Sequence, residues 1–132
     1  MQRHGSILNS RLLAAIAALG HGELILVAGT DLAVPLGVEI LDLSLVPGVP
    51  AFGQTLAAVV AELQVESVVL AAELQADDSE MAAEVQGLLE GIHTTFVDNV
   101  QLSAMAANAR LVVRTGETAP YTIAALVGGV TF

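Results

Sequence analysis

The chain has 132 residues, of which 55% are hydrophobic and only 3% aromatic, so we expect one domain over residues 1–132 with an aliphatic core. Fourteen acidic residues against four arginines and no lysine give a formal net charge of −10, which argues against binding to nucleic acid or to anionic membranes. The absence of cysteine excludes disulfides and thiolate chemistry, and it fits a cytoplasmic protein. The apolar surplus also predicts a homo-oligomer, because a small domain cannot hide that much apolar surface.

The first predicted element is a helix from about Ser10 to Leu19. Asn9 and Ser10 are suited to cap its N-terminus, its leucines and isoleucine fall on one face, and Gly20 stands where a C-cap glycine belongs. The apolar stretch resembles a signal-peptide core, but the caps and the one-sided pattern favour a helix of the folded domain. The chain has no run of about 18 uninterrupted apolar residues, so no membrane span is expected.

Apolar runs and helical periodicity then alternate to the end of the chain. The predicted strands are 23–28, 38–45, 67–72, 94–97, 111–114 and 122–127, and the further predicted helices are 51–64, 79–90 and 101–108. Residues 77–80, Asp-Asp-Ser-Glu, are candidates to cap the helix of residues 79–90, but the acidic stretch 73–84 is expected to be mainly a solvated helix face. This alternation predicts an α/β fold, a three-layer sandwich with a largely parallel central sheet.

Elimination leaves proton transfer as the chemistry that the residues allow. Without lysine or cysteine there is no Schiff base or thiolate, and the chain has neither a nucleophile elbow nor a phosphate-binding glycine motif. His4, His21 and His93 do not have metal-ligand spacing, so no metal is expected. His21 lies between two glycines where a helix gives way to a strand, and an imidazole exchanges protons near neutral pH. The alternative is that His21 only caps the helix or pairs with Glu23.

Short stretches spread over nearly the whole chain form a recognisable pattern. They are 4–10, 19–23, 40–45, 47–52, 65–66, 113–117, 120–121 and 129–132. The pattern resembles that of the ribose pyranase and fucose mutarotase (RbsD/FucU) family, and its two ends are the most specific parts. The resemblance implies a Rossmann-like subunit that assembles into rings, often stacked as decamers. It also implies interconversion of sugar ring forms, such as ribopyranose to ribofuranose, without any cofactor.

The resemblance assigns two residues of this chain to a sugar pocket between neighbouring subunits. His21 matches the family's catalytic histidine, and Tyr121 matches a tyrosine that lines the pocket. Such a pair suits the chemistry, because ring opening removes a proton from the anomeric hydroxyl and delivers one to the ring oxygen.

The chain departs from the family pattern at four polar positions. Gly29 stands where the family has a sugar-binding aspartate, and Asp31 is expected to replace it only if the loop is redrawn. Asn99 falls near the family's second pocket histidine, Ser103 near a lysine, and Ile123 at an asparagine. A buried sugar hydroxyl without a partner costs about 1–3 kcal/mol, so recognition of free ribose should weaken.

Three functions therefore remain open: weak mutarotase activity through His21 and Tyr121, action on a less hydroxylated or modified monosaccharide, or a non-catalytic, ring-forming binding protein. One interpretation of Arg114 and Glu117 is an acid–cation pair in the site. We expect instead that they form a structural turn that presents Tyr121. Asp42 is a weaker candidate of the same kind, and His93 is expected to be a surface or cap residue.

Overall fold

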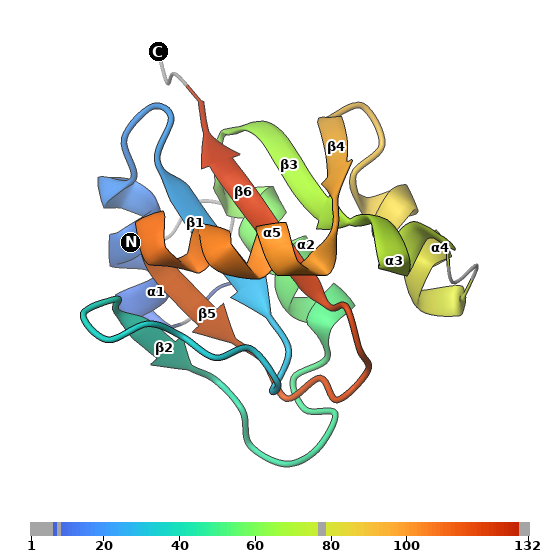
Figure 1. Cartoon of the computed structure of the whole chain (residues 1–132). Helices are drawn as coiled ribbons and strands as arrows, with labels where there is room; N and C mark the ends of the chain where they lie inside the picture. The colour runs from blue at the N-terminus through green and yellow to red at the C-terminus, as the bar shows by residue number, and fades with distance from the viewer. Residues whose placement is uncertain (1–6, 8, 77–78, 130–132) are drawn as a thin grey trace.

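The computed structural model describes residues 7, 9–76 and 79–129, and the description below concerns these residues (Figure 1). Their helices and strands follow in the order α1 (Ser10–Ala18), β1 (Leu24–Ala28), β2 (Ile40–Asp42), α2 (Phe52–Glu62), β3 (Val65–Ala71), α3 (Ala72–Ala76), α4 (Glu80–Leu88), β4 (His93–Val97), α5 (Asn99–Ala104), the 3-10 helix η1 (Met105–Asn108), β5 (Ala109–Arg114) and β6 (Ile123–Gly128). The α/β class is therefore confirmed.

The six strands form one sheet in the order β2-β5-β1-β6-β3-β4. The pairs β1–β5, β2–β5 and β3–β4 are parallel, whereas β6 runs antiparallel to both β1 and β3. The sheet is thus mixed, and the expectation of a largely parallel sheet holds except at β6. The connection from β5 to β6, residues 115–122, is too short to carry a crossover helix, so β6 returns in the opposite direction.

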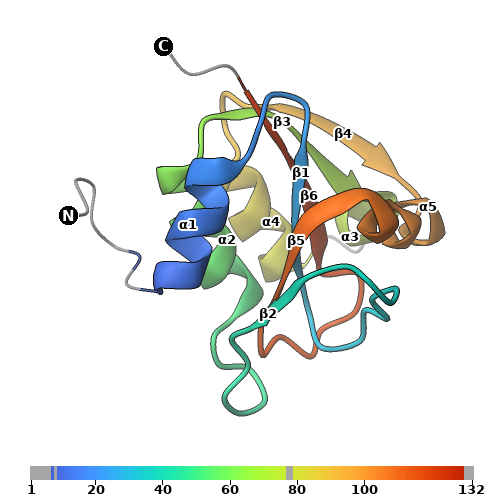
Figure 2. The same ribbon diagram turned by 90° about the vertical axis from the view of Figure 1, so that its left-hand side faces the viewer.

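Helices cover both faces of the sheet, which gives three layers (Figure 2). Alternate residues of β1 point to opposite faces: Ile25 and Val27 join one core cluster, and Leu26 and Ala28 join the other. The first cluster contains buried side chains of α1, α2 and α4, and the second contains buried side chains of α3, α5 and η1. Both faces of β1 are therefore buried, as its continuous apolar run predicts.

Helix α1 begins as predicted but ends differently. The Asn9 side chain accepts a hydrogen bond from the Leu12 amide at 3.0 Å, so Asn9 is the N-cap. Gly20 is not a left-handed C-cap: the chain leaves the helix at Leu19 in an extended conformation, and the left-handed glycine of this turn is Gly22, at φ 83°. Gly20 instead leaves room for the Glu23 side chain, since a Cβ there would lie 2.8 Å from a carboxylate oxygen of Glu23.

Two other expected elements differ clearly from their expected bounds. The strand expected at 38–45 is confined to β2, and the helix expected at 101–108 is divided between α5 and η1. Ser79 caps α4 through a hydrogen bond from the Ala82 amide, as expected, whereas Asp77 and Asp78 lie outside the described residues. The short helix α3 was not predicted. Within the described ranges, no helix is both long and apolar enough to cross a membrane.

Candidate functional site

His21 lies in a tight turn between α1 and β1. The Glu23 amide donates to the Gly20 carbonyl at 3.1 Å, which closes a four-residue turn with His21 and Gly22 at its centre. Gly22 has a φ of 83°, a conformation that this turn position requires and that glycine adopts without steric cost. The turn therefore presents the imidazole at the surface, at the edge of the sheet where β1 begins.

The Glu23 carboxylate fastens this turn. Its Oε1 accepts a hydrogen bond from the Gly20 amide at 2.5 Å, and both of its oxygens accept from Nη1 of Arg110, at 3.1 and 2.9 Å. The bond from Gly20 and, next, the bond from Arg110 hold the pKa of Glu23 below its ordinary value, because both stabilise the charged carboxylate. Glu23 is thus engaged by these two partners.

The imidazole of His21 instead contacts Glu66, in β3. Nε2 of His21 lies 3.2 Å from Oε1 of Glu66, and both side chains are about half exposed, at 56% and 52%. The contact passes over the end of β6, where the chain has Gly128 and Gly129. A Cβ on Gly128 would lie 2.9 Å from the Gly20 carbonyl oxygen, so glycine permits the close approach of the turn.

Tyr121 lies at the opposite edge of the sheet, just before β6. Its φ is 63°, a left-handed conformation that costs a non-glycine residue about 1–3 kcal/mol, and its side chain is exposed. The surrounding loop holds it there: the Thr122 hydroxyl donates to the Ala119 carbonyl at 2.9 Å, and the Gly29 amide donates to the Thr122 carbonyl at 2.8 Å.

Arg114 and Glu117 belong to this scaffold, as the sequence predicts. Glu117 accepts hydrogen bonds from the amides of Phe52, at the start of α2, and of Ala119, within its own loop. Arg114 donates to the Leu32 carbonyl at 2.9 Å, which ties the β1–β2 loop to β5. The two side chains are therefore engaged with backbone groups on different segments.

Two further expected site residues lie at the same edge as Tyr121. Asp31 is exposed in the loop after β1, and Asn99 begins α5 directly after β4. The Asn99 amide donates to both carboxylate oxygens of Glu73, at 2.9 and 3.1 Å, and its side-chain Oδ1 is buried without a partner in the described structure. Asp31, Asn99 and Tyr121 therefore lie at the same end of the sheet, although β6 and β3 separate the strands that precede Asp31 and Asn99.

Gly29 is buried beneath the loop that carries Tyr121. A Cβ at this position would overlap the Thr122 hydroxyl and would lie 2.9 Å from the Glu117 carbonyl oxygen. The loop packs so closely on the end of β1 that no side chain fits there. An aspartate at position 29 is therefore incompatible with this loop placement.

His21 does not join the other candidates within one subunit. Gly22 bonds to Gly128 at one end of β6, and Tyr121 precedes Ile123 at the other end. The six residues of β6 place these ends about 17 Å apart, at about 3.4 Å per residue.

The two remaining candidates, Asp42 and His93, contact none of the other candidate residues through a hydrogen bond in the described structure. Asp42 accepts hydrogen bonds from Ser44, which lower its pKa, and His93 is the exposed first residue of β4.

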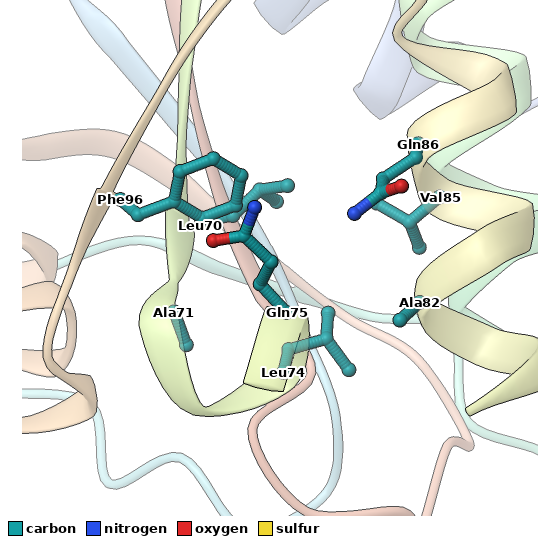
Figure 3. A pocket seen from close by; sticks show the side chains of 8 residues that line it. All are labelled: Leu70, Ala71, Leu74, Gln75, Ala82, Val85, Gln86 and Phe96. Atoms are coloured by element: carbon teal, nitrogen blue, oxygen red, sulfur yellow. The ribbon is translucent and has the colours of Figure 1, made fainter. Parts of the chain in front are cut away.

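The described surface contains a large open hollow near the candidate residue Tyr121 and a very small one elsewhere. An open hollow of about 330 Å³ lies among the loops at the Tyr121 edge, lined by Thr30, Ser44, Thr118 and apolar residues. A small, half-open hollow of about 10 Å³, between β3, β4, α3 and α4, has room for at most one water molecule (Figure 3). Gln75 and Gln86 extend toward it from facing helices. Among the described residues, no group of three His, Asp or Glu side chains is placed to hold a metal ion.

The structure adds Glu66 to the His21 site, an acidic residue that sequence reasoning considered only as part of a matched stretch. Glu23 was considered as a partner of His21, but it bonds to Gly20 and Arg110 instead. Glu66 lies 45 positions from His21 in the chain, and only the strand order β1-β6-β3 brings the two together. No local sequence signal reports such a contact.

Comparison with known proteins agrees with this architecture. The sequence matches the RbsD / FucU transport protein family over residues 1–131. It is 41% identical to the D-ribose pyranase of Pseudomonas putida (strain W619) over 128 residues, which cover 96% of this chain and 97% of that protein. It is 39% identical to the D-ribose pyranase of Laribacter hongkongensis (strain HLHK9), with complete coverage of both chains.

Among solved structures, Bacillus subtilis RbsD complexed with D-ribose superposes with a TM-score of 0.92 and 40% sequence identity over the whole of both chains. A match of this extent covers every strand and helix described above, the turn of His21 and the loop of Tyr121 included. The chain therefore belongs to the RbsD/FucU family.

Proposed function

We propose that this protein interconverts ring forms of a monosaccharide, as a D-ribose pyranase-like isomerase that needs no cofactor and uses His21 for proton transfer. The proposal rests mainly on the hydrogen-bonded turn of residues 20–23, which holds the exposed imidazole of His21 beside Glu66 at the edge of the sheet. The relatives named D-ribose pyranase and the related structure complexed with D-ribose support a sugar substrate.

The chemistry requires only one mobile proton. When the pyranose opens, the anomeric hydroxyl loses its proton, the bond between C1 and the ring oxygen breaks, and the ring oxygen gains a proton. Closure through a different hydroxyl reverses these steps and gives the furanose. An imidazole that titrates near neutral pH suits both transfers, and a phenol such as that of Tyr121 orients a sugar hydroxyl by a hydrogen bond.

We further propose that the complete site forms between two copies of the chain, with His21 from one copy and the Tyr121 edge from its neighbour. The separation of about 17 Å along β6 supports this arrangement, because one small sugar cannot span it. Exposed apolar side chains in the loop after β2, at the same end of the sheet as Tyr121, also favour contact with another copy. They are Leu45, Val46 and Val49.

The activity is tested by saturation-transfer NMR of D-ribose, with and without the protein. We expect faster exchange between pyranose and furanose signals with the wild type and no acceleration with His21→Ala. Circular dichroism of the variant controls for folding. An H21A variant that accelerates exchange as well as the wild type would remove His21 from the mechanism, and a wild type without any effect would support a different substrate or the non-catalytic alternative.

The shared site is tested by combining two defective variants. H21A and Tyr121→Ala are each expected to lack activity, but their co-expression in mixed assemblies pairs intact His21 of one copy with intact Tyr121 of another. Random mixing restores about one site in four. Recovery of activity would support the shared site, whereas mixed assemblies as inactive as either parent would place both residues in the same subunit's site.

A second candidate substrate is a less hydroxylated monosaccharide. The close packing of Thr122 and the Glu117 carbonyl over Gly29 favours it, because it leaves no room for a carboxylate at position 29 to bind a sugar hydroxyl. The same NMR experiment on D-ribose and on its 2-deoxy analogue distinguishes the two. Faster exchange of the deoxy sugar would favour this candidate, and faster exchange of ribose would exclude it.

A further inference from the structure

The contact between His21 and Glu66 distinguishes the two nitrogens of the imidazole. Nε2 is the nitrogen that faces Glu66, at 3.2 Å from Oε1. An ionised carboxylate only accepts hydrogen bonds, so Nε2 must carry a hydrogen for this bond to form. In a neutral imidazole the other nitrogen, Nδ1, then has the free lone pair.

The strand order brings the two backbone segments of this contact close together. β1 and β3 both pair with β6, so His21 and Glu66 belong to segments about 10 Å apart that face each other across one strand. Gly128 and Gly129 keep that strand free of side chains at the crossing point. A Cβ on Gly129 would touch the Cβ of Glu66 at 3.5 Å, and the Gly22 amide bonds to the Gly128 carbonyl at 2.9 Å.

We propose that Glu66 is a positioning residue that holds His21 with its proton on Nε2, so that Nδ1 is the nitrogen that exchanges protons with the sugar. This inference rests on the proposed function, since it assigns the atom through which His21 acts. Glu66 touches the imidazole and not the reacting atoms.

One nitrogen suffices for the ring opening. Nδ1 takes the proton of the anomeric hydroxyl as the C1–O bond of that group becomes a carbonyl. The bond from C1 to the ring oxygen breaks, and the ring oxygen takes the same proton back from Nδ1. Both oxygens are bonded to C1, so a single donor–acceptor atom reaches both. The Glu66 carboxylate stabilises the imidazolium that exists between the two transfers.

The tautomer is measured by long-range proton–nitrogen correlation NMR on the full chain labelled at histidine, with H21A to assign the signals. We expect the wild-type His21 to show the Nε2–H pattern. Glu66→Gln keeps an acceptor oxygen and should retain that pattern, whereas Glu66→Ala should show a mixture of tautomers. Glu90→Gln, which alters an exposed carboxylate in the turn before β4, is the matched control and should leave the signals of His21 unchanged.

Kinetics give the second readout. E66A should lower kcat for ring interconversion about tenfold with little change in KM, and E66Q should recover most of the loss, because the hydrogen bond orients the ring without binding the sugar. Wild-type His21 with its proton on Nδ1, or E66A with an unchanged kcat, would overturn the role of Glu66. If the protein has no ring-interconversion activity, the proposed function fails, but the tautomer measurement still decides whether Glu66 positions the imidazole.

Discussion

Gly29 and Thr122 meet where the Tyr121 loop closes over the end of β1. Both residues are buried, and the Thr122 hydroxyl lies in the space that a side chain at position 29 would need. The two positions are 93 residues apart in sequence, yet neither is free to change alone. At the scale of single residues, this pair accounts for the departure from the family pattern at position 29.

Gly29→Ala should therefore lower the free energy of unfolding by about 1–3 kcal/mol, the usual cost of overpacking a tight site. Adding Thr122→Ala should recover part of that loss, since it removes the overlapping hydroxyl, whereas Thr122→Ser retains the hydroxyl and should recover less. Urea unfolding of the single and double variants measures the coupling. Strictly additive effects would show that the two side chains do not compete for the same space.

At the scale of an element, the turn before β1 depends on Glu23. The hydrogen bond from Gly20 and the contact with Arg110 lower the pKa of this carboxyl below its ordinary value of 4.5. A group whose pKa falls on folding contributes stability at pH values above its unfolded pKa. It loses that contribution as the pH falls through the folded pKa.

The stabilisation by Glu23 relative to Glu23→Gln should accordingly be full at neutral pH and disappear as the pH falls below 4.5. Urea unfolding of both proteins at neutral pH and at about pH 3 measures this difference. Asp42, whose pKa is also lowered, is present in both proteins and cancels. A difference that is the same at both pH values would mean that the Glu23 charge does not stabilise the turn.

The local sequence pattern predicts most helices and strands of this fold, but it does not predict the hydrogen bonds that join distant elements to one another. The buried strand β1, the Asn9 cap and the Ser79 cap all follow from residues within a few positions of one another. Other helix starts are capped from far away: Glu117 accepts from the first amide of α2, and Glu73 accepts from the first amide of α5. Such contacts depend on strand order, which sequence periodicity does not encode.

The candidate site, too, could be predicted from the sequence only in part. The position of His21 between two glycines predicts a turn and makes His21 a candidate site residue, and the resemblance of the chain to a known family adds Tyr121 as a candidate. The separation of these residues by the length of β6 appears only once the antiparallel direction of that strand is known. The roles of His21, Tyr121, Asp31 and Asn99 in binding or catalysis stay predictions.

At the scale of the whole molecule, apolar side chains stand exposed on the loops near Tyr121. Leu45 is 76% exposed, and Val46 and Val49 follow it in the same turn region. Exposed aliphatic groups gathered in this way are typical of a surface that another protein covers. A strongly acidic chain also repels its own copies, so apolar contact must offset that repulsion in any assembly.

Leu45→Asp should leave the isolated subunit folded, since exposed positions usually tolerate substitution within about 0.5 kcal/mol. If this surface forms the proposed interface between copies, the variant should dissociate that assembly and abolish the proposed ring interconversion. Light scattering coupled to size-exclusion chromatography and the ribose NMR experiment measure the two effects. Ala83→Asp, which adds the same charge at an exposed position of α4, is the control. An L45D protein that keeps both its mass and its activity would exclude this surface from the interface.

The direction of β6 also determines how many working sites an assembly contains. Under the proposed arrangement each copy offers His21 at one end of this strand and Tyr121 at the other, so copies join head to tail. Two copies joined in this way have one complete site and an incomplete site at each free end, and a longer open row also has two incomplete sites. Only when the last copy contacts the first does the number of complete sites equal the number of subunits. A closed ring is therefore the arrangement in which every His21 and every Tyr121 belongs to a complete site.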